Sequence, residues 1–155
     1  MTTIIPTYCD PSALQCATVC AALGMNVLAL KRTAPSEPIQ DTNGVLIYPT
    51  STLAELLPRT THLLLCCPLT DATRGMIGAA ELSLLPPAAV VVNIGRAEVI
   101  DEVALWDALN DSEKKLAFAA DVWWNEPGPP GAKPDGHEQP LWPSRFPMHE
   151  HPNVV

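Results

Sequence analysis

Residues 88–96 have the sequence Ala-Ala-Val-Val-Val-Asn-Ile-Gly-Arg, an apolar run that ends in an amide, a glycine and a cation. Comparable apolar runs of five or six residues occur at 25–30, 62–67 and 116–120. Each has the length and composition of a strand that is buried on both faces. Segments of helical character separate these strands, so the sequence predicts an α/β domain with a doubly wound parallel sheet covered on both sides.

Helix signals fill the gaps between the strands. Helices are predicted over 12–23, 50–57, 79–85 and 102–109. Asp10-Pro11 supplies a cap and a first-turn proline for the first helix, and Gly24 occupies a position that commonly ends one. Asp101 is placed to cap the last helix, whose acidic first turn the helix dipole favours. Short strands are also expected at 45–48 and from 153 onward, with a polar loop over 32–43.

The composition fits one domain of ordinary size. The chain has 155 residues, with 9 Lys+Arg against 17 Asp+Glu, for a formal net charge of −8. This length suits a single domain spanning 1–155. An acidic chain lacks the basic patch that releases counterions, which argues against nucleic acid or an anionic membrane as the main partner. The longest apolar runs fall far short of the roughly 20 residues that a membrane span requires.

Cysteine and proline are used in an informative way. The five cysteines include Cys66-Cys67 inside an apolar strand, which favours reduced thiols and a cytoplasmic location over a set of disulfides. Prolines number 17, about 11% of the chain against a usual value of about 5%. They concentrate near the end, so residues 127–152 are predicted to form a proline-rich loop within the domain.

Polar residues follow each of the predicted strands. They are Lys31-Arg32, Pro68-Leu69-Thr70, Asn93 to Arg96, and Asp121 running on to Glu126. Each one alone has an ordinary explanation as a solvated loop residue or a turn cap. However, the carboxyl ends of parallel strands meet at one edge of the sheet, where ligands of doubly wound folds bind. The sequence therefore predicts a binding site at this edge.

Four stretches, in this order, resemble motifs of one known family. They are Leu65-Cys-Cys-Pro-Leu-Thr-Asp-Ala-Thr73, Val91-Val-Asn-Ile-Gly-Arg96, Val99-Ile-Asp-Glu-Val-Ala-Leu105 and Asp121-Val-Trp-Trp-Asn-Glu-Pro127. From roughly residue 12 to 155 the chain resembles the NAD(P)-binding domain of the D-isomer-specific 2-hydroxyacid dehydrogenases. The resemblance implies a Rossmann-like domain of an oxidoreductase that interconverts 2-keto and 2-hydroxy acids with NAD(P).

The resemblance also implies roles for individual residues. Arg96 matches the arginine that holds the substrate carboxylate, for which a guanidinium offers a planar, permanently charged fork. Glu126 matches the carboxylate that raises the pKa of the family's catalytic histidine and fixes its tautomer. Asp121 matches the residue that accepts from the nicotinamide carboxamide. The other implied cofactor-binding positions are Cys67, Pro68, Thr73, Asn93, Ile94 and Gly95, and Thr73 is also expected to cap a turn.

The glycine loop that binds the pyrophosphate in the family is replaced in this chain. Counting back from Gly24 places Tyr8, Asp10 and Ala13 at its three glycine positions. Glycine lets the backbone turn tightly and approach a phosphate, and Asp10 adds a negative charge there. The stretch from Thr2 to Pro6 is short and contains a proline, so the first strand is predicted to be damaged. We expect the affinity for the cofactor to suffer.

The residues after the second strand bear on the choice of cofactor. NAD-specific members of such folds carry an acidic residue there, which holds the adenosine ribose. This chain has Lys31 and Arg32 instead. Two cations suit a 2′-phosphate, so NADP(H) is somewhat favoured over NAD(H). The alternative is that both are solvated loop cations.

Two parts of the family pattern are expected to be missing. The catalytic histidine of the family follows a segment like Asn153-Val-Val, and the sequence ends at Val155. His149 and His151 precede that segment, so they are expected near its opposite end. A separate substrate domain is also expected to be missing. The resemblance therefore predicts a truncated domain, incomplete at both ends and inactive or weak by itself.

Two functional hypotheses remain open. The first is the cofactor domain of an NAD(P)-dependent oxidoreductase that acts on the CH–OH group of 2-hydroxy acids. The second is a non-catalytic fragment that binds NAD(P)(H) or another protein. Both are compatible with a homodimer or a heterodimer, since segments of this domain dimerise in the family.

Overall fold

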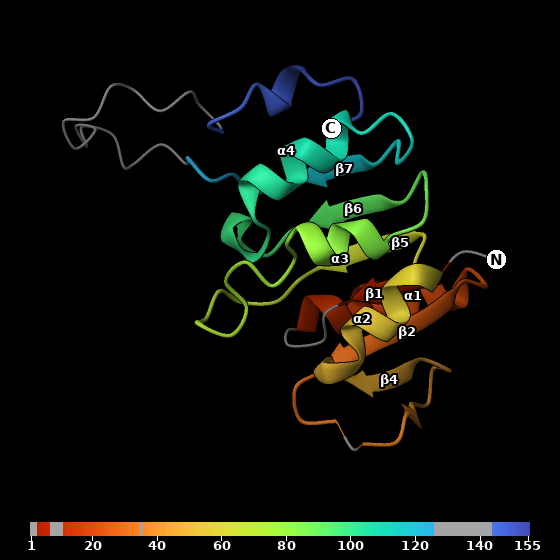
Figure 1. The fold of residues 1–155 in the computed structure, drawn as a ribbon. Coiled ribbons are helices and arrows are strands. Elements are labelled where there is room, and N and C mark those ends of the chain that lie inside the picture. The colour runs from red at the N-terminus through yellow and green to blue at the C-terminus, as the bar shows by residue number, and fades with distance from the viewer. Residues whose placement is uncertain (1–2, 7–10, 35, 126–143) are drawn as a thin grey trace.

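The computed structural model describes residues 3–6, 11–34, 36–125 and 144–155. Its strands are β1 (Thr3–Pro6), β2 (Asn26–Lys31), β3 (Ile39–Gln40), β4 (Leu46–Pro49), β5 (His62–Leu65), β6 (Val90–Asn93) and β7 (Ala117–Ala120). They form one seven-stranded sheet in the order β3-β4-β2-β1-β5-β6-β7 (Figure 1). All neighbours pair in parallel except β3, which runs antiparallel to β4. The chain winds outward from β1 in both directions, which confirms the predicted doubly wound α/β class.

The helices are α1 (Pro11–Ala22), α2 (Leu53–Leu56), α3 (Ala79–Leu84) and α4 (Glu102–Asn110). All four predicted helical segments are thus confirmed, although the second contains only one turn of α-helix flanked by 3₁₀ turns. Gly24 has a φ of +78°, the left-handed conformation expected of a residue just past a helix. None of the described helices is long and apolar enough to cross a membrane.

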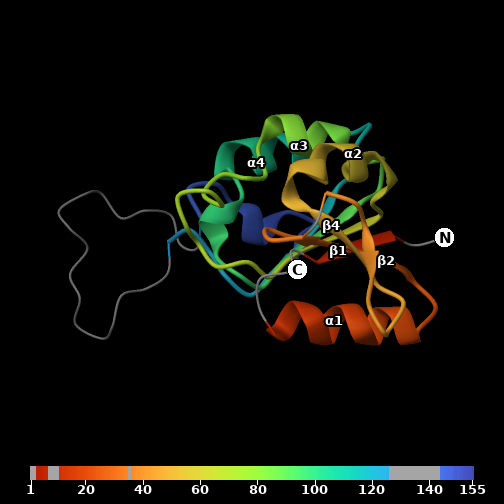
Figure 2. The ribbon, with the colours of Figure 1, turned by 90° about the horizontal axis from the view of Figure 1, so that it is seen from below.

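The helices are divided unevenly between the two faces of the sheet. Figure 2 shows α2, α3 and α4 on one face and α1 on the other. The face under α2, α3 and α4 is packed, with Leu63, Val91 and Phe118 almost fully buried. Their neighbours Leu64 and Val92 point to the other face and are only half-buried. The prediction that helices cover both faces of the sheet is therefore confirmed only for the part of the sheet next to α1. Among the described residues, no helix covers the remainder of the face on which α1 lies.

The first strand corrects an expectation. The stretch that ends in Pro6 was predicted to be damaged, yet β1 occupies the centre of the sheet. Ile4 is in register with Val27 of β2 on one side and His62 of β5 on the other. Pro6 is tolerated because it is the last residue of the strand, where a missing N–H interrupts the least of the ladder.

Two further segments differ in detail from the prediction. The polar loop over 32–43 contains the two-residue strand β3, which its exposed, proline-flanked sequence gave no reason to expect. Of the predicted proline-rich loop over 127–152, residues 127–143 lie outside the described part. The remainder forms a 3₁₀ turn over Met148–Glu150. Val154 then makes a parallel bridge to Phe118, so the strand expected from residue 153 begins beside β7.

Candidate functional site

A cleft of about 290 Å³ opens at the carboxyl end of the sheet. It lies between the loop that follows β5 and the loop that follows β6. These strands are neighbours, with Leu65 in register with Asn93, so their loops must meet. The cleft is lined by Cys66, Cys67, Pro68, Leu69, Ile94, Gly95 and Arg96. Five residues predicted from the sequence are therefore gathered in one cleft: Cys67, Pro68, Ile94, Gly95 and Arg96.

The two loops touch at Gly95. A Cβ atom on this residue would lie 2.6 Å from the backbone oxygen of Cys67 and 3.4 Å from the Leu65 oxygen. Real Cβ atoms do not approach backbone oxygens so closely, so only glycine fits between the loops. Because Gly95 lines the cleft and has no side chain, part of the lining is backbone, which a flat ligand can approach closely.

Asn93 holds the second loop in shape from beneath. Its side chain is fully buried, its Nδ2 donates to the Arg96 oxygen at 2.9 Å, and its Oδ1 accepts from the Gly95 nitrogen at 3.0 Å. The Ile94 nitrogen donates to the Leu65 oxygen at 3.0 Å. The backbone donors of 94 and 95 are thus used within the protein. Any hydrogen bond of this loop to a ligand must therefore come from its carbonyl oxygens or from Arg96.

Arg96 supplies the positive charge of the cleft. The residue is exposed, and its Nη1 donates to the Gly95 oxygen at 2.8 Å. Among the described residues it forms no ion pair. A guanidinium anchored at one nitrogen, with its other N–H groups uncommitted to a carboxylate, can bind an anion in bidentate fashion.

The loop after β5 is stabilised by Thr73. Its hydroxyl donates to the Pro68 oxygen at 2.7 Å and accepts from the Thr70 nitrogen at 2.8 Å. The prediction that Thr73 caps a turn is confirmed. Because the hydroxyl is engaged on both sides, Thr73 shapes the wall of the cleft from behind rather than lining it.

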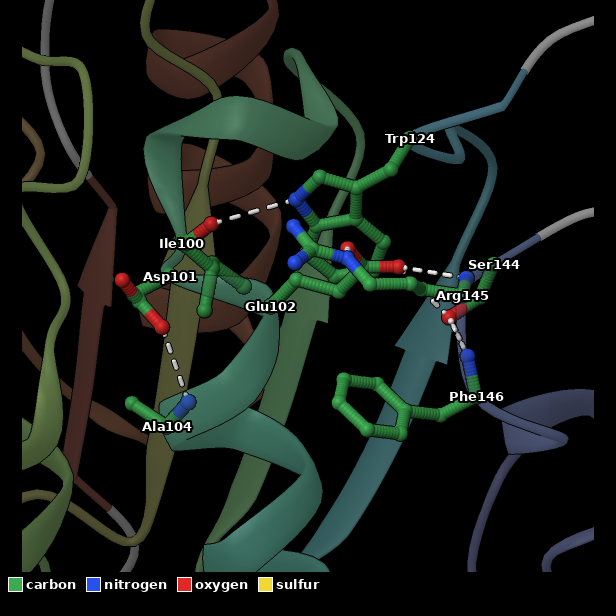
Figure 3. A network of polar contacts seen from close by, with 8 residues as sticks. All are labelled: Ile100, Asp101, Glu102, Ala104, Trp124, Ser144, Arg145 and Phe146. Atoms are coloured by element: carbon green, nitrogen blue, oxygen red, sulfur yellow. Dashed lines mark hydrogen bonds and ion pairs between the residues drawn. The ribbon is translucent and has the colours of Figure 1, made fainter. Parts of the chain in front are cut away.

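Asp121 and Trp124 follow β7, which pairs with β6 on the side away from β5. The Asp121 nitrogen donates to the Asn93 oxygen at 3.1 Å, which ties the end of β7 to the end of β6, and the residue is exposed. The Trp124 indole nitrogen donates to the Ile100 oxygen at 3.3 Å (Figure 3). Its ring also packs against Phe118, with centroids 6.4 Å apart. Glu126, the predicted partner of a catalytic histidine, lies outside the described residues.

Lys31 and Arg32 lie elsewhere on the same edge. Lys31 ends β2, which is separated from β5 by β1, and both side chains are exposed. In the described part of the chain neither cation has an ionic partner. They stand apart from the cleft, at the position along the sheet edge where the second half of an extended ligand would reach.

The family comparison decides the identity. The model of the D-isomer specific 2-hydroxyacid dehydrogenase NAD binding domain matches residues 13–155. The chain belongs to this family. The resemblance inferred from the four motifs, and with it the NAD(P)-binding class of the domain, is thereby confirmed.

Relatives in this family include enzymes of defined activity. The chain is 35% identical over 106 residues to a D-3-phosphoglycerate dehydrogenase of Methanocaldococcus jannaschii, covering 68% of this chain and 20% of the relative. It is 38% identical over 105 residues to a glyoxylate reductase of Thermococcus gammatolerans, covering 67% of this chain and 30% of the relative. The chain therefore spans only a fifth to a third of the length of these relatives.

A solved structure gives the same picture. The D-isomer specific 2-hydroxyacid dehydrogenase from Xanthobacter autotrophicus Py2, in complex with NADPH and MES, superimposes with a TM-score of 0.77 at 25% identity. The match covers 99% of this chain and 43% of that protein. The fold of the 2-hydroxyacid dehydrogenase cofactor domain is thus present over nearly the whole chain.

At both ends of the carboxyl edge of the sheet, the described residues are of a kind that could bind a dinucleotide. The cleft lined by Gly95 and Arg96 suits the nicotinamide end, and the exposed cations Lys31 and Arg32 suit the adenosine end. The pyrophosphate position between them is less complete. Ala13, at the third glycine position, is fully buried, so its methyl group is accommodated within the fold. Tyr8 and Asp10, at the other two positions, lie outside the described residues.

Sequence reasoning missed one buried polar residue at the start of α4. Glu102 was assigned to the acidic first turn of a helix, where such residues are normally solvated. In the structure its side chain is buried and contacts Ser144 and Arg145 (Figure 3). No local pattern could have revealed this, because the partners are more than 40 residues away.

Proposed function

We propose that this chain is the NADP(H)-binding part of an oxidoreductase that interconverts 2-keto and 2-hydroxy acids. The observation that carries the proposal is the cleft that Arg96, free of an ion pair within the described residues, lines together with Gly95 and Cys67. Such a cleft offers a flat surface for a nicotinamide ring and a guanidinium for the carboxylate of a small acid. The relatives act on acids of this class according to their names.

Each residue has a proposed task in this function. Arg96 binds and orients the substrate carboxylate, which places the 2-keto carbon against the nicotinamide face. Asp121 accepts from the carboxamide, and Glu126 orients a histidine that donates the proton to the keto oxygen. Bound nicotinamide supplies the hydride. In this scheme the chain contributes the substrate arginine and the cofactor contacts, and a separate substrate domain and a histidine complete the enzyme.

We also propose a preference for NADP(H). Lys31 and Arg32 are exposed cations at the end of β2, where the adenosine ribose of a dinucleotide lies in a doubly wound fold. A 2′-phosphate carries close to two negative charges, so it gains from both side chains. Neither cation forms an ion pair in the described part of the chain, so both charges are available to such a phosphate.

The test is a fluorescence titration of the purified chain with NADPH and NADH, in which tryptophan is excited and energy transfer to the nicotinamide is followed. We expect saturable binding with NADPH preferred by about tenfold, which corresponds to about 1.4 kcal/mol. The K31A/R32A variant should bind NADPH and NADH equally, whereas K115A, which removes an exposed lysine far from the cleft, should keep the preference. No binding by the folded chain would refute the proposal.

The second candidate function is a non-catalytic module that binds NAD(P)(H) or a protein, as a homodimer or heterodimer. It is favoured by the half-buried Leu64 and Val92, since an apolar sheet face of this kind is suited to association. Turnover separates the candidates: the enzyme hypothesis expects glyoxylate-dependent NADPH oxidation when a substrate domain of the family and a segment carrying the catalytic histidine are both supplied. We propose a cytoplasmic location for either, because Cys66 and Cys67 are buried directly after β5, a position that favours reduced thiols over a set of disulfides.

A further inference from the structure

Glu102 is a buried carboxylate at the first position of α4. Its side chain is 5% exposed. The Ser144 hydroxyl and the Arg145 backbone nitrogen both donate to Oε1 at 2.8 Å, and the Arg145 Nε donates to Oε2 at 2.9 Å (Figure 3). A carboxylate removed from water is costly unless it is hydrogen-bonded in this way. The helix dipole would favour the same charge in an exposed position, so the dipole alone does not account for the burial.

The partners of Glu102 begin a segment that returns to the sheet. Phe146 stacks on Trp106 of α4 with ring centroids 5.3 Å apart and an interplanar angle of 6°. Further along, the Val155 nitrogen donates to the Phe118 oxygen at 2.9 Å, and the Ala120 nitrogen donates to the Val155 oxygen at 3.1 Å. The segment 144–155 therefore braces the second half of β7, which leads directly into Asp121.

On its other side, Glu102 is continuous with the loop that forms the cleft. Arg96 is followed by a 3₁₀ turn over Ala97–Val99 and then by Ile100 and the cap of α4. Ile100 accepts from the Trp124 indole, and the Asn93 oxygen accepts from the Asp121 nitrogen. Arg96 thus stands on the loop that leads into α4, Asp121 follows the strand that pairs with the segment 144–155, and Glu102 joins α4 to that segment. Glu102 itself does not line the cleft.

We propose that Glu102 is a positioning residue for the nicotinamide half of the cofactor cleft. By tying the start of α4 to the segment 144–155, it sets the position of the end of β7, and with it Asp121, relative to the loop that carries Arg96. The proposal rests on the proposed function, because it assigns a purpose to the cofactor cleft. The adenosine half of the proposed site lies at the end of β2, on the other side of the sheet centre, so Glu102 does not influence it.

The experiment compares ligands that probe the two halves separately. NADPH extends along the carboxyl edge of the sheet to the cleft, whereas adenosine 2′,5′-bisphosphate reaches the adenosine end with Lys31 and Arg32 and the first phosphate position, but not the nicotinamide cleft. E102Q keeps an oxygen for Ser144 and the Arg145 backbone but places an amide N–H₂ against the Arg145 Nε. We expect E102Q to raise the Kd for NADPH at least fivefold and to leave the Kd for the bisphosphate within twofold. D107N, an exposed acid on the same helix, is the matched control and should change neither.

Amide hydrogen exchange and the ring signals of His151 test whether E102Q releases the segment 144–155 from β7. His151 lies edge-on to Trp106 with centroids 6.0 Å apart, so release of the segment should move its proton shifts toward random-coil values. Exchange at Ala120 and Val155 should rise at least tenfold in E102Q, while β5 and β6 remain protected. R145M, which removes only the exposed guanidinium, should show the same changes to a smaller extent and serves if E102Q does not fold.

The outcomes separate the two proposals. Equal weakening of NADPH and the bisphosphate would show that Glu102 only stabilises the fold, and unchanged binding of both would show that it has no influence on the cleft. Either result overturns the positioning role while the proposed function stands. If the unsubstituted chain binds neither ligand, the proposed function itself fails and the inference falls with it.

Discussion

The backbone oxygen of Cys67 lies 2.6 Å from the point that a Cβ on Gly95 would occupy, so the loops after β5 and β6 meet without room for any side chain. The contact joins two stretches of sequence 28 positions apart, each of which follows a buried strand. It explains why a glycine ends the Asn-Ile-Gly run, and it means that the shape of the cleft depends on residue 95 having no side chain.

Gly95→Ala should therefore both destabilise the chain and change the shape of the cleft. The added methyl group meets backbone, which cannot rotate away, so the two loops must separate. Forcing an extra carbon into a packed site typically costs 1–3 kcal/mol, and we expect about 3 kcal/mol here. The midpoint of urea unfolding measures this change.

Gly78→Ala is the matched control for this substitution. A Cβ at Gly78 would meet the flexible side chain of Glu81 at 3.4 Å and the Gly75 oxygen at 3.9 Å, which are close to ordinary contacts. Its cost should remain below about 1 kcal/mol, the usual effect of replacing a helix cap. Equal losses for the two alanine variants would contradict the packing argument.

Arg96 should control the binding of small carboxylates. A bidentate, charge-assisted contact contributes roughly 3 kcal/mol, so Arg96→Met should weaken oxamate binding to the NADPH-loaded chain by about 100-fold. Arg96→Lys should recover only part of the loss, because an ammonium lacks the planar fork. Isothermal titration with oxamate measures both. A lysine variant that binds as well as the unsubstituted chain would argue against a bidentate contact.

Asp101 caps α4 and should contribute to its stability in a predictable way. Its side chain accepts from the Ala104 nitrogen at 2.8 Å. Replacing such a cap by alanine typically costs about 1 kcal/mol, whereas asparagine caps nearly as well. Thermal unfolding of D101A and D101N should show this order. If asparagine costs as much as alanine, the charge of Asp101 matters more than its hydrogen bond.

The sequence was sufficient to predict the parts of this fold that local patterns encode. The apolar runs specified the parallel strands, and Asp101 and Gly24 marked helix ends, because caps and glycine stops act within one turn. Ligands of doubly wound folds bind at the carboxyl ends of the strands, and this rule correctly predicted that Cys67, Pro68 and the Ile94–Arg96 loop lie together, since strand direction alone decides where these loops meet.

Features that depend on distant contacts could not be predicted in this way. The burial of Glu102 depends on Ser144 and Arg145, and the tolerance of Pro6 depends on its position at the very end of β1. The sequence also could not predict that part of the sheet face on the α1 side has no helix over it among the described residues. Leu64 and Val92 are as apolar as their buried neighbours, so composition could not show that the described helices leave them half-buried.

Cys20 provides a test of local electrostatics on α1. Burial raises the pKa of the Cys20 thiol above its usual value of 9.0, and the neighbouring Cys16, one helical turn earlier, raises it further. A raised pKa means less thiolate at a given pH, and the thiolate is the reactive form. At pH 8 Cys20 should therefore react with iodoacetamide more slowly than free N-acetylcysteine, with a rate that climbs as the pH rises through 9 and beyond.

Cys16→Ser separates the two causes. It removes the like charge that forms on Cys16 at high pH but leaves the burial of Cys20 intact, so the pKa should fall only part of the way toward its ordinary value. Peptide mass spectrometry of the alkylated chain follows Cys20 alone. If Cys16→Ser restores the full reactivity of a free thiol, burial contributes nothing. If it leaves the rate profile unchanged, burial alone accounts for the shift.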